Sequence, residues 1–419
     1  HWNKYPKSVH YYDMYHYYIG GKYFQELGYF DLYKATVVAD QDNRKFFNHI
    51  KKFKNIRDLK TDKIIPWRHA MKDAERIKGN FTPERWKEFV DDIESFQRQM
   101  PARHWRHALK DFGFNPPPPW ALMGRLMAEI PNIQYQWQLI ALGWVDVLFM
   151  IVGFIFVYRA FGLYPFMMTV LLFGINYTQR YQHMSGSLLR LDWLAYVLIG
   201  ISMLKLKKPK WGGFFLGYAT MLRVFPLMFL AGIGFKWLYT AIKERKIVND
   251  DFKTLLASLV TAIALFGITL VVKPGLDGWK TWVENISHHS QRLTVKRIAL
   301  QYLFIYAGET SNKEWKAIKK GKSTYTYRDA RKEQFIVPIR ILQAAGLAMF
   351  ILIAVRSPSW VAATLGMILV YVLTNPVRYY WAMLAGLGSF LITTPLQGKR
   401  LLAFFMLMFV FIVDYAIDS

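Results

Sequence analysis

The sequence predicts an all-α polytopic membrane protein, a helical bundle with about nine to eleven membrane segments. Hydrophobic residues make up 53% of its 419 residues, and after about residue 138 they gather into long apolar runs. The formal net charge is +25, and the charged residues lie between these runs. This pattern is typical of a protein whose helices cross the membrane and whose water-facing parts meet anionic headgroups or phosphates.

The chain divides into four regions. Residues 1–137 hold no run of the roughly 20 apolar residues that a spanning helix needs, so we expect an exocytoplasmic, interfacial region of amphipathic helices. Residues 138–273 predict a first transmembrane bundle, 274–337 a basic exocytoplasmic loop, and 338–419 a C-terminal transmembrane bundle. The expected spans are 139–158, 163–176, 188–204, 253–273, 338–355, 359–374, 379–394 and 400–415.

Composition also excludes several classes of function. The chain contains no cysteine, which rules out disulfides, cysteine zinc sites and thiol catalysis. Nucleic acid is a common partner of basic proteins, but the spread of charge between apolar runs favours membrane lipids and predicts no nucleic-acid binding. The sequence begins with His1 and residues 2–18 are not a signal peptide, so we expect a further segment upstream.

The first notable stretch is His10–Tyr33, which combines an early carboxylate, Asp13, with two imidazoles and many tyrosines. A carboxylate among tyrosines commonly accepts hydrogen bonds from their hydroxyls, so a structural role for Asp13 stays open beside a catalytic one. Secondary site candidates are His16, His288, His289 and Asp40. The histidines lack the i, i+4 spacing of a metal-binding helix, so we predict no metal site, although a divalent metal held by oxygen ligands remains the alternative.

A helix is predicted to begin at Thr82, because a threonine cap followed by Pro83 suits the first helical turn. Apolar residues then recur at helical spacing and indicate a face that packs on the protein or lies in the membrane interface. They are Trp86, Phe89, Val90, Ile93 and Phe96.

The apolar stretch 211–238 is interrupted by Leu222-Arg223-Val224-Phe225-Pro226. It is too short for two ordinary spans and too broken for one, so we expect a re-entrant pair of half-helices that meet near Arg223. Broken backbone within a membrane must line a protein cavity. An arginine there is functional by default, although pairing with Asp192 or capping of free carbonyls is the alternative.

The short loops determine the predicted orientation. Lysine and arginine residues at 205–210, 243–246, 356 and 399–400 share one side, which the positive-inside rule makes cytoplasmic. The N-terminal region, the basic loop and Asn375–Tyr380 then share the exocytoplasmic side. A basic surface on that side fits a phosphate-bearing substrate or a partner protein.

The order of these parts resembles the GT-C superfamily of integral-membrane glycosyltransferases, nearest the bacterial polyprenol-phosphate-mannose-dependent mannosyltransferases. The shared features are Asp13 before Leu27-Gly28-Tyr29 and Leu32-Tyr33, a basic residue before Pro226, and a late loop, Asn375–Tyr380. Two positions depart from the pattern. Arg378 stands where a histidine is expected, and Lys296-Arg297 stands where relatives tend to carry asparagine.

The resemblance implies an inverting transfer of a sugar, such as mannose, from a polyprenyl-phosphate donor to a lipid or glycan acceptor in the bacterial cell envelope. It assigns the protein to the inner membrane, with no other cofactor. Asp13 would act as the base, since a carboxylate near the acceptor hydroxyl contributes about 10² to 10⁴-fold. Arginine and lysine side chains would hold the leaving phosphate, and aromatic side chains would stack on the sugar or isoprenoid. The candidates for these donor-binding roles are Arg223, Arg378, Lys296, Arg297, Tyr379 and Tyr380.

At several of these positions, a structural or membrane-anchoring role is the alternative to a role in the reaction. Arg378 at a helix end can extend to lipid headgroups, and tyrosine clusters near span ends commonly form an interfacial belt. A second hypothesis for the whole chain is a noncatalytic subunit that keeps the fold and scaffolds a membrane complex, motivated by the two departures. A third is a transporter for an anionic lipid, suggested by the broken segment.

Overall fold

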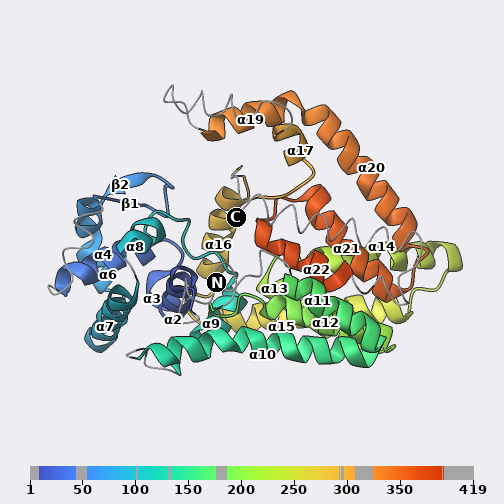
Figure 1. The fold of residues 1–419 in the computed structure, drawn as a ribbon, viewed down its shortest axis with the longest axis horizontal. Helices are drawn as coiled ribbons and strands as arrows, with labels where there is room; N and C mark the ends of the chain where they lie inside the picture. Colours follow the sequence, from blue (N-terminus) through green and yellow to red (C-terminus); the bar gives the residue numbers. More distant parts are fainter. Residues whose placement is uncertain are drawn as a thin grey trace.

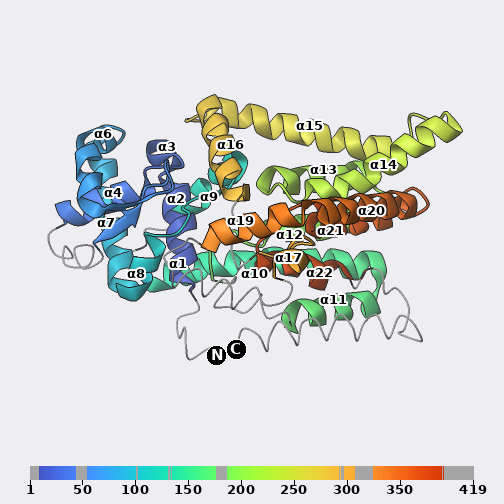
Figure 2. The same cartoon turned by 90° about the horizontal axis from the view of Figure 1, so that it is seen from above.

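A computed structural model describes residues 9–43, 54–100, 102–130, 133, 135–175, 186–291, 293, 297–306, 324–388 and 390. They form two parts: an N-terminal module of residues 9–130, at the left in blue and cyan in Figure 1, and a bundle of long helices beside it. Figure 2 shows the bundle helices running side by side, with the module at one end of them.

The N-terminal module is built from short helices. In chain order they are α1 (Tyr11–Met14), the π-helix η1 (Tyr15–Ile19), α2 (Gly20–Lys22), α3 (Phe24–Leu27), α4 (Leu32–Asp42), the 3-10 helix η2 (Trp67–Asp73), α6 (Ala74–Lys78), α7 (Pro83–Gln99), α8 (Ala102–Ala108) and α9 (Pro118–Glu129). A small antiparallel sheet lies between α4 and η2. Its strands β1 (Asn55–Arg57) and β2 (Ile64–Pro66) pair Ile56 with Ile65. The sequence predicted only helices in this region, so the prediction missed this two-stranded sheet.

Helix α7 confirms the predicted start at Thr82. The Thr82 hydroxyl accepts a hydrogen bond from the Arg85 backbone N–H at 3.2 Å. Phe89 and Phe96 on its apolar face are fully buried. Between the two alternatives for this face, the structure therefore favours packing on the protein over the membrane interface.

The bundle begins with α10 (Gln136–Phe161). It continues with α11 (Leu163–Ile175), α12 (Asp192–Lys205), α13 (Pro209–Leu222), α14 (Leu227–Glu244), α15 (Asp250–Val271), α16 (Leu276–Gln291), α17 (Tyr302–Ile305), α19 (Thr324–Gln334), α20 (Ile336–Ala354), α21 (Ser359–Leu373), the 3-10 helix η4 (Arg378–Trp381) and α22 (Ala382–Gly388). In the described residues, three helices are long and apolar enough to cross a membrane: α10, α15 and α20. A membrane bundle is thus supported, but nine to eleven segments are not. The predicted span 400–415 lies outside the described residues.

The predicted break near Arg223 is confirmed. Helix α13 ends at Leu222, Arg223 is extended, and α14 begins at Leu227, directly after Pro226. Proline supplies no backbone N–H donor and cannot continue a helix from the residues before it, which explains the position of the break.

Close helix packing holds the broken pair against α15. A Cβ atom added at Gly213 would lie 2.1 Å from the Thr254 carbonyl oxygen, and one at Gly217 would lie 2.7 Å from that of Ser258. The Ser258 hydroxyl donates to the Gly213 carbonyl at 2.8 Å. Glycines four apart let two membrane helices approach this closely, so the end of α13, and Arg223 with it, has a fixed position.

Candidate functional site

Asp13 lies on α1, where the N-terminal module meets the bundle. Its Oδ2 atom is 3.1 Å from Nδ1 of His10 and 3.5 Å from a guanidinium nitrogen of Arg190. Burial raises the pKa of Asp13, but the charge of Arg190 and the contact with His10 outweigh that effect and hold the pKa well below its usual range. The group is therefore an ionised carboxylate at neutral pH.

Arg190 was not among the residues singled out from the sequence, yet it is central to the site. It is 7% exposed. Its guanidinium donates a hydrogen bond to the Tyr17 hydroxyl and lies over two aromatic rings, 4.5 Å from the centre of Tyr17 and 4.6 Å from that of Tyr379. Arg190 thus connects η1 of the module to η4 near the end of the bundle.

The backbone around Arg190 is held from three sides. Leu189 has a φ of 48°, a conformation that non-glycine residues rarely adopt. The Trp120 indole N–H donates to the Leu189 carbonyl at 3.0 Å, and the Asp146 carboxylate of α10 accepts from the N–H groups of Arg190 and Leu191 at 2.7 and 3.0 Å. Strained backbone that is held this firmly occurs preferentially at functional sites.

Arg223 also lies near Tyr17. Its guanidinium is 5.5 Å from the ring centre of Tyr17 and 5.6 Å from that of Trp120, and the residue is 7% exposed. In the described part of the chain, its buried Nε atom has no hydrogen-bond partner. Nor does it form an ion pair with Asp192, whose carboxylate accepts from the Trp193 N–H at 2.8 Å. Tyr17 therefore has two buried cations near its ring.

The late loop contributes Tyr379 to this cluster through the contact with Arg190. Tyr380 is buried against Trp193, at 5.3 Å between ring centres, and Phe225, at 4.5 Å, and it interacts electrostatically with Arg223. The backbone of Arg378 belongs to η4, but its side chain lies outside the described part of the structure. Of the late-loop candidates, the structure thus brings Tyr379 against Arg190 and Tyr380 near Arg223.

The guanidinium of Arg297 bonds to a backbone carbonyl group of the late loop. Its guanidinium donates to the Asn375 carbonyl at 2.5 Å, and the Ile298 N–H donates to the Pro376 carbonyl at 2.9 Å. An isolated bridge also pairs Arg297 with Val377. These bonds fasten the basic loop to the late loop. Lys296 lies outside the described residues, as do the side chains of His288 and His289.

His16 and Asp40 lie deeper in the N-terminal module. Nδ1 of His16 is 2.7 Å from the Tyr12 carbonyl, which only accepts, so we assign the proton to Nδ1. Nε2 then accepts from the Tyr33 hydroxyl at 2.7 Å, which leaves neither nitrogen for a metal. Asp40 accepts from the Gln97 amide at 2.5 Å, and burial raises its pKa to about 7. Within the described ranges, no three metal-binding side chains cluster.

The two arginines of this site have different partners. We call Asp13, Tyr17, Arg190, Arg223 and Tyr379 the reaction cluster. The Asp13 carboxylate lies against Arg190, while Arg223 has aromatic rings beside it and the carboxylate of Asp192 at longer range. Arginine in such surroundings is well suited to bind an oxyanion such as phosphate.

Comparison with known sequences and structures gives one family. The sequence model of glycosyltransferase family 87 matches residues 114–377. The matched range includes Arg190 and Arg223 and begins after Asp13. No curated protein and no solved structure matches the chain.

Proposed function

The chain belongs to glycosyltransferase family 87, and we propose that it transfers a sugar from a polyprenyl-phosphate donor, with mannose as the first candidate, to a lipid or glycan acceptor. Its apolar helices and its family make it an integral membrane protein. We further propose the bacterial inner membrane as its location, with the reaction cluster on the exocytoplasmic side. The observation that carries the proposal is the ionised Asp13 beside the buried Arg190, with Arg223 near the same Tyr17 ring.

In the proposed reaction, Asp13 acts as the general base. Its Oδ2 atom faces His10 and Arg190, while Oδ1 makes no hydrogen bond among the described residues and is available to accept a proton. The acceptor oxygen forms a bond to the anomeric carbon, and its proton passes to Asp13. The bond between that carbon and the phosphate oxygen breaks, and its electron pair stays on the phosphate. Attack opposite the leaving group inverts the configuration.

Arg190 and Arg223 are the proposed partners of the phosphate. The leaving phosphate gains negative charge as its bond to the sugar breaks, and preorganised cations in a partly dry site stabilise this charge more strongly than water does. The same anion would offset the charge of Arg190 that lowers the pKa of Asp13. Donor binding would therefore make Asp13 a stronger base when it is needed.

The first test replaces Asp13 by asparagine. The purified protein, in lipid nanodiscs, is given radiolabelled polyprenyl-phosphate mannose and a membrane lipid extract as acceptor source. We expect Asp13→Asn to lower label transfer by about 10² to 10⁴-fold, because the proton acceptor is lost. The matched control is Asp31→Asn, which removes a carboxylate of similar exposure, 16% against 14%, that pairs with Arg76 instead.

Full transfer by Asp13→Asn would remove Asp13 from the chemistry. A wild-type protein that transfers no label and purifies with a stoichiometric partner would instead support the scaffold hypothesis. One observation at Arg297 favours this second candidate. The guanidinium of Arg297 donates to the late loop, and Arg297 stands where relatives tend to carry asparagine.

A further inference from the structure

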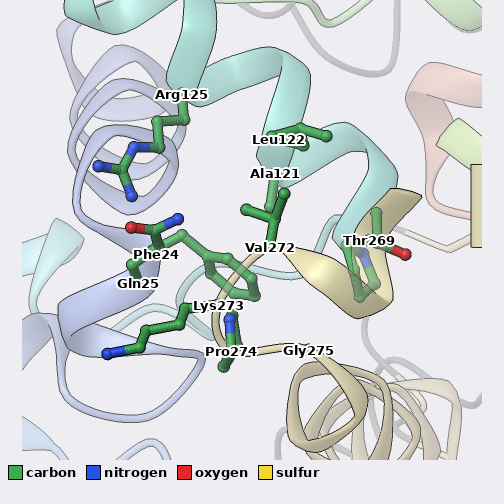
Figure 3. Close-up of a pocket in the computed structure, with 11 residues that line it drawn as sticks. Phe24, Gln25, Ala121, Leu122, Arg125, Thr269, Val272, Lys273, Pro274 and Gly275 are labelled. Atoms are coloured by element: carbon green, nitrogen blue, oxygen red, sulfur yellow. The ribbon is translucent and has the colours of Figure 1, made fainter. Parts of the chain in front are cut away.

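A hollow separate from the reaction cluster lies where the N-terminal module meets the end of α15 (Figure 3). Helix α9 supplies Ala121, Leu122 and Arg125, and the segment after α15 supplies Val272 and Lys273. In Figure 3 the polar ends of Arg125, Gln25 and Lys273 lie toward one side, and the apolar side chains of Leu122 and Val272 lie toward the other. The hollow is therefore amphipathic, with its cations on one side.

Arg125 has one ion-pair partner among the described residues, Glu129, and shares it with Arg85. Glu129 is 3.3 Å from Arg125 but only 2.6 Å from Arg85, which also pairs with Glu26 and Glu88. Nη1 of Arg125 has no hydrogen-bond partner among the described residues. In the same part of the chain, Lys273 forms no ion pair. Together, Arg125 and Lys273 suit a single negative charge.

The surroundings place the hollow at a membrane boundary. Helix α15 is long and apolar enough to span a membrane and ends at Val271. Val271 is 86% exposed and Leu276 53% exposed, on either side of Lys273. The Trp279 indole N–H donates to the Thr269 hydroxyl at 2.9 Å, which holds α16 against the end of α15. Exposed aliphatic side chains next to a lysine and a tryptophan are typical of the zone where acyl chains meet headgroups.

We propose that this hollow binds the headgroup phosphodiester of an anionic glycerophospholipid. The phosphate lies between Arg125 and Lys273, and the acyl chains run along the exposed face of Val271 and Leu276. The lipid thereby bridges α9 and α15, which belong to the module and the bundle. The site uses none of the side chains of the reaction cluster, so it stands independently of the proposed transferase activity.

The test measures thermal unfolding of the purified protein in detergent micelles with added phosphatidylglycerol or phosphatidylcholine. A ligand that binds only the folded protein raises its melting temperature. We expect phosphatidylglycerol to raise it more than phosphatidylcholine does. Arg125→Gln and Lys273→Gln should each weaken the apparent affinity for phosphatidylglycerol about tenfold, a loss of one charge-assisted bond.

Two controls sharpen the result. Lys280→Gln removes a lysine near the same boundary that is 67% exposed and pairs with Asp277, and it should leave the lipid effect unchanged. Asp13→Asn should also bind phosphatidylglycerol like the wild type, whatever its transfer activity. Because Lys273 forms no ion pair among the described residues, its variant tests the site even if Arg125→Gln fails to fold.

Three outcomes would overturn the proposal. The first is equal protection by the two lipids, and the second is an unchanged response of Lys273→Gln. The third is protection by inorganic phosphate or by polyprenyl phosphate that equals or exceeds that by phosphatidylglycerol, since it would assign the hollow to a different ligand.

Discussion

Two groups of buried cations in this protein differ in their contacts with carboxylates. In the N-terminal module, the ammonium of Lys22 is 2.7 Å from a carboxylate oxygen of Asp92 and 2.8 Å from one of Glu88. At the junction with the bundle, Arg190 lies 3.5 Å from the carboxylate of Asp13, while Arg223 forms no ion pair among the described residues and has Asp192 only at longer range. Lys22 is therefore in direct contact with two carboxylates, whereas Arg223 is in direct contact with none in the described structure.

The difference separates a structural role from a binding role. Asp92 accepts from the Tyr23 hydroxyl at 2.7 Å as well as from Lys22, so the Lys22 cluster has no need of a ligand. Arg223 has aromatic neighbours but no ion pair among the described residues. Buried charges are costly unless they are paired. We therefore expect an anion to bind at Arg223.

The largest expected effect on stability comes from breaking the Lys22 cluster. Lys22→Met leaves Asp92 buried without its cation, and removing one partner of a buried ion pair typically costs about 3–5 kcal/mol. We expect the melting temperature of the purified protein in detergent to fall by many degrees. Lys87→Met is the control, because Lys87 is exposed on the same helix as Asp92. Similar melting temperatures for the two variants would contradict the structural role of Lys22.

Changing Arg223 should have the opposite signature. Arg223→Gln breaks no ion pair in the described structure, so we expect little change in melting temperature. Sugar transfer should fall by about 10² to 10³-fold, the usual loss when one preorganised stabiliser of developing charge is removed. Arg223→Lys should recover part of the activity, since it keeps the charge but not the planar fork.

The matched control for Arg223 is Arg340→Gln, which removes an exposed arginine of α20 that bonds only to Gln343 among the described residues. It should retain full transfer. A large fall in melting temperature with Arg223→Gln, and no specific loss of transfer, would make Arg223 a structural residue like Lys22.

The sequence predicted local features better than the pairing of distant ones. The break at Arg223 and the cap at Thr82 could be predicted because each depends on a few consecutive residues. The approach of Arg190 to Asp13 depends on how α1 packs against the bundle, which no local pattern encodes. One signal was present: Arg190 and Asp192 are two charged residues at the start of an otherwise apolar run, and charged residues within such runs commonly mark a functional site.

Arg297 and the small sheet illustrate two other limits. The basic loop indicated a phosphate ligand, but the carbonyl groups of the late loop compete for the same donor, and Arg297 bonds to that of Asn375. Strands β1 and β2 have three residues each, too few for an alternating pattern to be recognised. The positions of Lys296 and of the Arg378 side chain stay predictions.

The smallest expected effect concerns Asp40. Asp40 is a buried carboxylate that forms no ion pair among the described residues, whereas Arg223 is a buried cation that forms none. Its Oδ2 atom has no hydrogen-bond partner among the described residues, and burial raises its pKa to about 7, against roughly 3.9 in an unfolded chain. The native state therefore retains a proton that the unfolded state releases. The resulting stabilisation is complete below about pH 4 and is lost as the pH rises through 7.

Asp40→Asn keeps the shape of the protonated acid and cannot ionise. We therefore expect its melting temperature, measured relative to the wild type, to be several degrees higher at pH 8 than at pH 5. Asp31→Asn, which removes an ion pair with Arg76, should show no such gain. An equal difference between Asp40→Asn and the wild type at both pH values would mean that folding causes no change in the proton bound by Asp40 in this range, and it would contradict the raised pKa of this carboxyl.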